Sequence, residues 1–382
     1  MKPILVIAAI LLAGAPAVGD TNPRARDLGI PFDGTPGTLN AITDVDGVTV
    51  GHETIVRDLP NDRAVRSGVT AILPRGRSTL EANVYAAWTP LNGNGEMTGT
   101  TWVSESGFLE GPVMITNTHS IGAVHEGVIR WRIDQAGPDE SGYFWSLPVV
   151  AETWDGHLND INGFHVRAEH AMAALDHAAT GPVAEGSVGG GTGMICFEFK
   201  CGIGTSSRVV AIDGSAYTVG VLVQANFGLR RQLRVAGVPV GREFPGDLVW
   251  SRADTPATLR GSIIAVVATD APLLPGQLQR LARRVSLGIA RTGGTASNGS
   301  GDIFLAFSTA NPDAGRPGAR IQSLNNDLLD DLFEACVQAG EESIVNALVA
   351  GRTMTGDLGH RAVGIDREKL RKLLADHDRL AD

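Results

Sequence analysis

Short apolar runs and longer amphipathic stretches alternate along this chain. Val219–Val223 and Ile263–Val267 are apolar throughout, which is typical of strands that are covered on both faces. Over residues 275–292, apolar positions instead recur three and four residues apart, and this spacing predicts an amphipathic helix. Strands that occur in runs and also alternate with helices predict sheets sandwiched between helical layers.

The same patterns place the remaining elements. Further strands are expected near residues 68–73, 112–116, 195–199, 207–212, 217–225 and 302–308, and further helices at 122–133, 168–179, 324–339, 341–350 and 366–376. Gly340 separates the two long C-terminal helices in this prediction. Between Ala41 and Arg57, two strands flank Asp46-Gly47, which predicts a β-hairpin. Pro245–Ala257 is polar and irregular, and we expect an exposed linker there.

The first residues have the pattern of a secretory signal peptide. Lys2 precedes the apolar run Ile4–Ala13, and Ala17-Val18-Gly19 supplies small residues for cleavage. We therefore expect a signal peptide over residues 1–19 and a mature protein that is periplasmic or secreted, with no membrane attachment after signal removal. The run is too short for a comfortable membrane span. An N-terminal anchor or a misread start is the alternative.

Composition narrows the class of partner. The remaining chain, Asp20–Asp382, has room for one large domain or two ordinary ones. The net charge of −10 argues against nucleic acid as a partner, because nucleic-acid surfaces need clustered Lys and Arg. An acidic exported protein of this composition points towards small-molecule chemistry.

Three cysteines, Cys196, Cys201 and Cys336, are too few for a disulfide-stapled scaffold. A turn between Cys196 and Cys201 would allow them to pair. The segment between them resembles continuous strand, however, and residues five apart on one strand face opposite ways. We therefore expect free, buried thiols.

Several common types of site lack support in the sequence. The glycine-rich loop Val188–Gly193 has no Lys-Ser/Thr ending, and a strand follows it, so close backbone packing is favoured over phosphate binding. His52, His119 and His125 have no recognised metal-ligand spacing. No Gly-x-Ser-x-Gly elbow occurs. We expect no cofactor and no metal.

Two hydroxyl turns precede predicted strands. Gly261-Ser262 leads into Ile263–Ala268, and Asn298–Asp302 leads into Ile303–Phe307. Each is by itself an ordinary turn before a strand. Two hydroxyls at equivalent strand starts, however, can lie side by side in a sheet, with the Asp302 carboxylate beside them. A cut before Ser262 would also expose a new amine next to its own hydroxyl.

These segments together resemble the β-peptidyl aminopeptidase / L-aminopeptidase–D-esterase (D-aminopeptidase) family of self-processing N-terminal-serine hydrolases. The resemblance is carried by Gly261–Ile264, Ala268–Leu273, Asn298–Asp302, Val223–Asn226, Pro148–Thr153, Leu158–Asp160 and Gly189–Gly193. It implies a cut between Gly261 and Ser262, which gives a larger subunit of residues 20–261 and a smaller one of residues 262–382. Both would form one α/β domain, a four-layer αββα sandwich similar to N-terminal-nucleophile hydrolases but with different strand connectivity. A homo-oligomer, a tetramer of cleaved heterodimers, is also implied.

The resemblance assigns catalytic roles. Ser262 is the nucleophile, and Ser300 and Asp302 orient it and assist proton transfer. Asp302 stands where family members carry Glu. Asn226 matches the side-chain donor of the oxyanion hole. Elementary chemistry agrees, because a serine hydroxyl needs a base beside it, and a free α-amino group with a pKa of about 7.7–8.0 is partly neutral near pH 7.

The resemblance also implies the substrate. Glu152 matches the carboxylate that holds the free ammonium group, and Trp154 falls near a tyrosine that lines the family's site. We therefore expect an exported aminopeptidase for short peptides, amides or esters with a free amino end, acting on β-, L- or D-amino acyl groups through an acyl-enzyme. One alternative is an acyltransferase of the same fold, whose nucleophile is usually threonine. The other is an exported binding protein without catalysis.

Overall fold

A computed structural model describes residues 23–77, 82–136, 144–250 and 261–381. The signal peptide predicted over residues 1–19 and most of the linker predicted over 245–257 lie outside the described residues. In the described part of the chain, no helix has the length and apolar character that crossing a membrane requires.

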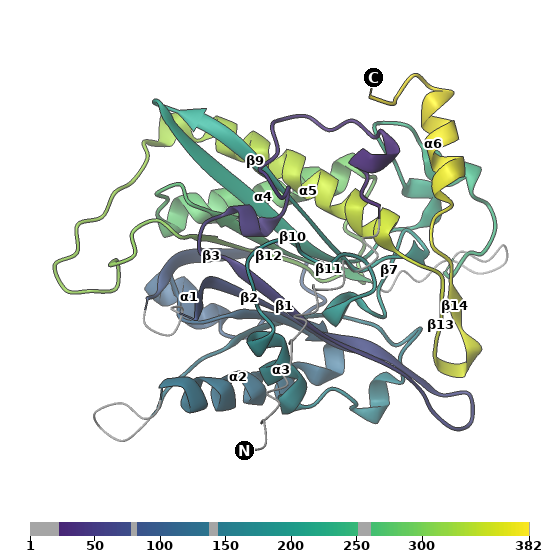
Figure 1. Ribbon diagram of the computed structural model, residues 1–382, viewed down its shortest axis with the longest axis horizontal. Helices are drawn as coiled ribbons and strands as arrows, with labels where there is room; N and C mark the ends of the chain where they lie inside the picture. Colours follow the sequence, from purple (N-terminus) through teal and green to yellow (C-terminus); the bar gives the residue numbers. More distant parts are fainter. Residues whose placement is uncertain (1–22, 78–81, 137–143, 251–260, 382) are drawn as a thin grey trace, which may run out of the picture.

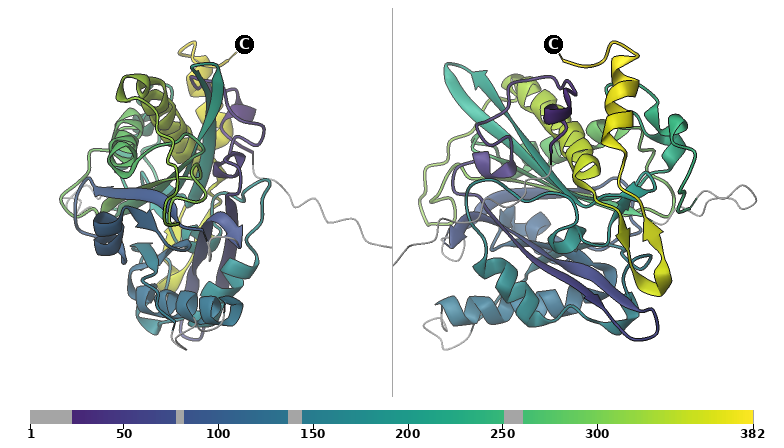
Figure 2. Two further views of the ribbon diagram at one scale, coloured as in Figure 1. Left: turned by 90° about the vertical axis from the view of Figure 1, so that its left-hand side faces the viewer. Right: turned by 45° about the vertical axis from the view of Figure 1, so that its right-hand side comes forward.

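The molecule is built of four layers, α-β-β-α. Helices α4 (Pro275–Arg291) and α5 (Asp330–Ala350) cover one face of a six-stranded sheet (Figure 1). The other face of that sheet packs on a four-stranded sheet, which α2 (Ile121–Ala136) and α3 (Ala168–Asp176) cover from outside. Figure 2 shows the same order of layers from two further sides. The predicted αββα sandwich is confirmed.

The strand order interleaves distant parts of the chain. The six-stranded sheet has the order β4-β3-β12-β11-β10-β9, with bounds Phe108–Leu109, Val84–Pro90, Asp302–Ser308, Ser262–Thr269, Ser215–Asn226 and Ile203–Ile212. The four-stranded sheet has the order β1-β2-β5-β6, with bounds Thr49–Asp58, Ala64–Arg77, Val113–Asn117 and Val149–Thr153. The smaller elements are α1 (Thr100–Ser106), α6 (Arg367–Ala375), β7 (Ile195–Cys196), β8 (Phe199–Lys200), β13 (Met354–Thr355) and β14 (Arg361–Ala362).

Alternate residues of the central strands fill different cores. Val221 and Val267 belong to the core beneath α4 and α5, whereas Leu222 and Val266 belong to the core between the two sheets. A third core lies between the four-stranded sheet and α2 and α3. Because successive side chains of a strand point to opposite faces, strands in the middle of four layers must be apolar throughout, as the sequence predicted.

Three local predictions are wrong. The first hairpin does not turn at Asp46-Gly47. Strands β1 and β2 pair from Thr49↔Leu73 to Asp58↔Ala64, so the turn lies beyond Asp58. Asn61 and Asp62 adopt the left-handed conformation there, with φ of 60° and 56°, which these two residue types tolerate.

The second error concerns Gly340, which does not end a helix. α5 continues through it as one helix of 21 residues. A Cβ on Gly288 of α4 would lie 2.9 Å from the Glu341 nitrogen and 3.2 Å from the Gly340 carbonyl carbon. Gly288 therefore lets α4 approach the α5 backbone closely at residues 340–341, and packing of this kind offsets the low helix propensity of Gly340.

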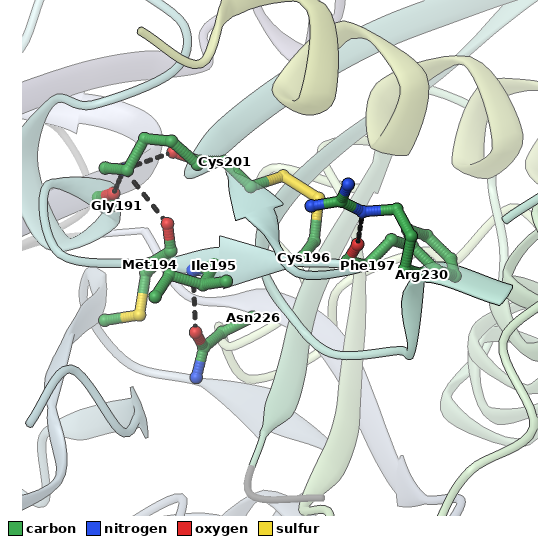
Figure 3. Close-up of a disulfide and its surroundings, with 9 residues drawn as sticks. Gly191, Met194, Ile195, Cys196, Phe197, Cys201, Asn226 and Arg230 are labelled. Carbon is green, nitrogen blue, oxygen red and sulfur yellow. Dashed lines mark hydrogen bonds between the residues drawn. A yellow bond between two sulfur atoms is a disulfide. The ribbon is translucent and has the colours of Figure 1, made fainter. Parts of the chain in front are cut away.

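The free thiols expected at Cys196 and Cys201 are also wrong, because these two cysteines form a disulfide with their Cα atoms 5.4 Å apart. The expected strand 195–199 is in fact the hairpin β7–β8. Phe197 and Glu198 turn it, with φ of 50° and 62°, and the turn brings the two sulfur atoms together (Figure 3). Cys336 is a free, buried thiol, as expected.

Candidate active site

Ser262 is the first residue of β11 and lies at the junction of three strands. β10 pairs with β11 in antiparallel register, so Asn226 stands opposite Ser262. β12 pairs with β11 in parallel register, with Asp302 opposite Ile263. Because neighbouring parallel strands start at one edge of the sheet, the two predicted hydroxyl turns do lie side by side.

The hydroxyl of Ser262 is buried and hydrogen-bonded. Its side chain is buried, with 5% of the residue exposed, and its Oγ accepts a 3.0 Å hydrogen bond from the Gly301 N–H. The Oγ therefore keeps its own hydrogen for transfer to a base. Gly261, before it, has no room for a side chain, because a Cβ there would lie 2.2 Å from the Asn226 carbonyl oxygen.

Ser300 and Asp302 form a pair beside this serine. Ser300 Oγ donates to Asp302 Oδ1 over 2.6 Å, and the Ile263 N–H donates to the same oxygen over 3.2 Å. Burial raises the pKa of Asp302, against the lowering effect of these hydrogen bonds. The carboxylate thus joins the turn of Ser300 to the strand that Ser262 begins.

A loop that the sequence analysis left without a role fixes this turn. Asn92 accepts a 2.6 Å hydrogen bond from the Asp302 N–H and donates a 3.0 Å bond to the Ser297 carbonyl. The Asn94 N–H donates to the Ser300 carbonyl over 3.2 Å. A Cβ on Gly301 would come within 2.5 Å of the loop backbone. The alternating Asn-Gly-Asn-Gly of residues 92–95 was the available signal, since its two asparagines supply amides and Gly95 permits close approach.

Both ends of the Asn226 amide are engaged. Its Oδ1 accepts a 2.8 Å hydrogen bond from the Ile195 N–H, and its Nδ2 donates a 2.8 Å bond to the Trp154 carbonyl. These contacts fix which end of the amide faces which neighbour. Among the described residues, the second hydrogen on Nδ2 has no protein acceptor, so it can be donated to an oxyanion.

Glu152 lies in the same site, although it comes from the other sheet. It sits near the end of β6 and is 3% exposed. Its carboxylate accepts a 3.1 Å bond from the Glu96 N–H and another from the Thr118 hydroxyl. A Cβ on Gly95 would lie 3.4 Å from Glu152 Oε1 and 3.0 Å from the Cα of Gly301, so Gly95 lies close to both the carboxylate and the Ser300–Asp302 turn. Burial raises the pKa of Glu152, while the two hydrogen bonds lower it.

Comparison with known proteins decides the family. The sequence pattern described as peptidase family S58 matches residues 40–362. The chain belongs to peptidase family S58. It is 52% identical to the β-peptidyl aminopeptidase BapA of Sphingosinicella microcystinivorans, over 98% of this chain and 97% of that protein. It is 46% identical to the protein of the same name from Sphingosinicella xenopeptidilytica, over 97% and 95%.

Solved structures agree with this S58 membership. The L-aminopeptidase D-Ala-esterase/amidase of Ochrobactrum anthropi, described as a new variant among the Ntn hydrolase fold, superposes with a TM-score of 0.88 at 49% identity and covers 94% of this chain and 100% of its own. A β-aminopeptidase of Burkholderia sp. gives a TM-score of 0.84 at 49% identity over 92% and 98%. The expected family, fold and enzyme class, a serine aminopeptidase or amidase, are thereby confirmed for this S58 chain.

The Trp154 side chain of this S58 chain packs in an aromatic cluster. Its ring lies 6.2 Å from that of Trp250, which also contacts His157, and His157 stacks on His360 at 4.6 Å. The indole therefore belongs to an aromatic cluster that includes Trp250, the last described residue before Gly261. Its backbone carbonyl, rather than its ring, contacts Asn226.

The glycine-rich loop of the S58 chain is a packing element. A Cβ on Gly190 would lie 2.2 Å from Gln224 Oε1 and 2.7 Å from the Ile115 carbonyl oxygen, so the loop lies where both sheets approach it. Within the described ranges, no group of three His, Cys, Asp or Glu side chains could hold a metal ion.

Proposed function

We propose that this protein cuts its own chain between Gly261 and Ser262 and then uses Ser262 as the nucleophile of an aminopeptidase. The observation that carries the proposal is the position of Ser262 at the very start of β11, between Asn226 on one strand and the Ser300–Asp302 pair on the other. A residue that begins a strand at this junction can become a chain end without any loss of sheet pairing. Ser300, Asp302 and Asn226 are the proposed catalytic partners.

The proposed cut is an acyl shift followed by hydrolysis. Ser262 Oγ attacks the Gly261 carbonyl carbon, the C–N bond to Ser262 breaks, and the Ser262 nitrogen takes up the hydroxyl proton. Water then hydrolyses the resulting ester, which leaves a Gly261 carboxylate and restores the Ser262 hydroxyl. Glycine suits the position before the cut because a side chain on residue 261 would collide with the Asn226 carbonyl oxygen.

In the cut protein, the new α-amino group of Ser262 serves as the base for its own hydroxyl. An ordinary α-amino group has a pKa of about 7.7–8.0, so part of it is neutral near pH 7. The free N–H of the Asn226 amide stabilises the oxyanion, a contribution of roughly 3–4 kcal/mol to the barrier when such a donor is well placed. An acyl-enzyme forms on Ser262 and is then hydrolysed.

The proposed substrates are short peptides, amides or esters with a free amino end. The buried carboxylate of Glu152 is suited to pair with an ammonium group, because such a pair is strong where water is excluded. A fixed carboxylate near the nucleophile limits cleavage to the first residue. Two relatives are named β-peptidyl aminopeptidases, which favours β-amino acyl groups over the L- and D-forms.

We also propose that the mature protein is periplasmic or secreted and assembles as a tetramer of cut heterodimers. The Cys196–Cys201 disulfide supports export, since such bonds persist in oxidising compartments. The oligomer rests on the family resemblance alone.

The test compares the wild-type protein with Ser262→Ala on a denaturing gel and in hydrolysis of the para-nitroanilides of β-alanine, L-alanine and D-alanine. We expect two bands and activity from the wild type, with Ser262 at the new N-terminus, and one inactive band from the variant. Ser300→Ala should still be cut at Gly261. Two bands from Ser262→Ala, or a new chain beginning at Ser300, would overturn the maturation scheme. Acyl transfer to an added amine without hydrolysis would favour a transferase.

A further inference from the structure

We propose that the disulfide-closed hairpin β7–β8 is a positioning device for the Asn226 amide, and that opening it slows the reaction without weakening substrate binding. This inference rests on the proposed role of Asn226 as oxyanion donor. It concerns a different part of the chain, residues 195–201, to which the family resemblance gave no role.

The first step is the orientation of the amide. Asn226 can serve the oxyanion only when its Nδ2 end faces the nucleophile and its Oδ1 end faces away. The Ile195 N–H, 2.8 Å from Oδ1, requires an acceptor and therefore excludes the flipped amide, which would present a donor to it. The Trp154 carbonyl favours the same orientation from the other end.

The second step is how the Ile195 N–H is held. Ile195 is the first residue of β7, and its strand partner is Lys200. The turn between them consists of Phe197 and Glu198, both with φ in the left-handed region. Two-residue turns of this type are usually built from Asn-Gly or Gly-Gly. Non-glycine residues in that region persist only where their surroundings enforce it.

The third step identifies what enforces the turn. The Cys196–Cys201 disulfide closes the hairpin directly (Figure 3). The Arg230 guanidinium donates to the Phe197 carbonyl over 3.0 Å and to the Glu198 carbonyl over 2.6 Å. The Phe197 N–H donates to the Phe227 carbonyl over 2.7 Å. Phe227 directly follows Asn226. The hairpin is therefore bonded to this segment twice, through the Ile195 N–H on Asn226 Oδ1 and through the Phe197 N–H on the Phe227 carbonyl.

The fourth step is the base of the hairpin. Lys200 is completely buried, and its ammonium donates to the carbonyls of Met194 at 3.0 Å and Cys201 at 2.6 Å. Met194 is the residue whose carbonyl precedes the Ile195 N–H. The Lys200 ammonium therefore holds the carbonyl of the Met194–Ile195 peptide group, and the disulfide holds β7, which starts at Ile195. Without the disulfide, the hydrogen bonds and the packing of the buried Phe197 ring on Phe227 would be left to oppose relaxation of the Phe197–Glu198 turn.

The experiment combines Cys196→Ala and Cys201→Ala in one protein, in both the wild-type and the Asn226→Ala backgrounds. Rates with β-alanine para-nitroanilide are divided by the amount of cut chain on a denaturing gel. In the wild-type background we expect kcat to fall on the order of tenfold, a fraction of the loss caused by deleting an oxyanion donor, with KM within about twofold. In the Asn226→Ala background we expect no further fall, because the two changes remove the same interaction.

Two further variants make the test decisive. Cys336→Ala removes the buried free cysteine between α4 and α5 and should leave kcat unchanged. Ile195→Pro removes the N–H that binds Asn226 Oδ1, and also replaces the buried Ile195 side chain, at the first residue of a strand, where proline is tolerated. It should reproduce the fall in kcat with the disulfide intact, so the test does not depend on folding of the cysteine variant.

The outcomes separate this proposal from the proposed function. An unchanged kcat in both the double cysteine variant and Ile195→Pro overturns the positioning role, as does an equal loss in the two backgrounds. An uncut wild type, or full activity of Asn226→Ala, would instead overturn the assignment of Ser262 or of Asn226. A fall in kcat that disappears in the Asn226→Ala background supports the positioning role.

Discussion

Ser300 Oγ and Asp302 Oδ1 lie 2.6 Å apart, and the hydroxyl donates to the carboxylate. Their hydrogen bond runs along the entry to β12, directly beside the first residue of β11. The Ile263 N–H on the same oxygen ties the pair to the neighbouring strand. The Asp302 carboxylate reaches the Ser300 hydroxyl although the two residues are only two positions apart in the chain.

The first prediction concerns the charge of this pair. Asp302→Asn keeps an oxygen for Ser300 and Ile263 but removes the negative charge, so it tests proton transfer rather than geometry. We expect kcat to fall about 10²-fold, the lower part of the range for general acid–base groups, measured per cut molecule. Asp302→Glu keeps the charge and should retain more activity than Asp302→Asn. Equal activity of Asp302→Asn and wild type would exclude the carboxylate from catalysis.

The second prediction concerns recognition of the amino end. Glu152→Gln should raise KM at least on the order of tenfold, the loss of one buried charge-assisted contact, with a smaller effect on kcat. Glu105→Gln, on the exposed surface of α1, is the matched control. An unchanged KM in Glu152→Gln would remove this carboxylate from substrate binding.

The pH dependence of KM follows from the same carboxylate. Burial raises the pKa of Glu152, so it gains a proton at a higher pH than the ordinary value of about 4.3. As the pH falls through this raised pKa, the carboxylate becomes neutral, and KM for substrates with a free amino end should rise. Glu152→Gln should lack this rise at acid pH. A wild-type KM that rises only around the ordinary value would contradict the assignment.

The third prediction concerns self-cleavage. Gly261→Ala places a methyl group where the Asn226 carbonyl oxygen is only 2.2 Å away, so the bond to be cut must shift from its place. We expect processing to slow by on the order of tenfold or more, since small misplacements have effects of that size. Activity per cut molecule should stay normal, because residue 261 belongs to neither the nucleophile nor its partners. Gly246→Ala, where a Cβ meets nothing within 4 Å, should be processed at the normal rate.

The fourth prediction concerns stability and Lys200. Burial lowers the pKa of Lys200 to about 7, whereas the unfolded chain keeps that proton up to about 10.4. Between these values the unfolded state binds more protons, so the free energy of unfolding should rise with pH by about 1.4 kcal/mol per unit. Lys200→Met should flatten this slope, and the exposed Lys372→Met should not. Urea unfolding of the uncut Ser262→Ala chain at several pH values measures this slope. An unchanged slope in Lys200→Met would show that Lys200 is not its cause.

The four layers and the proximity of Ser262 to Ser300 could be predicted from the sequence for one physical reason. A strand buried on both faces is apolar throughout, and Ile263–Val267 showed this plainly. Once two such strands are parallel neighbours, the residues before them must meet, which places Ser262 beside Ser300. The roles of Asn226 and Glu152 came from the family resemblance, and the structure places both residues at this junction.

The parts that escaped sequence reasoning depend on contacts that are distant in sequence or on unusual backbone. Asn92 reaches Asp302 across 210 residues, and nothing near Asn92 records that partner. The disulfide was missed because Phe-Glu gives no local signal for a tight turn, and its left-handed conformation is enforced from outside, in part by Arg230. Gly340 was taken as a break because glycine has a low helix propensity, which the packing of α5 in the core outweighs.

The strand order gives the proposed cut a further consequence. β11 and β12, from the C-terminal piece, lie between β10 and β3 of the N-terminal piece, so each piece supplies strands that the other lacks. Cutting would leave the native shape unchanged, yet refolding would turn from a first-order into a second-order process that depends on concentration. Maturation would then be a one-way event, because the cut protein, once unfolded, has lost the covalent link that let its two parts find each other.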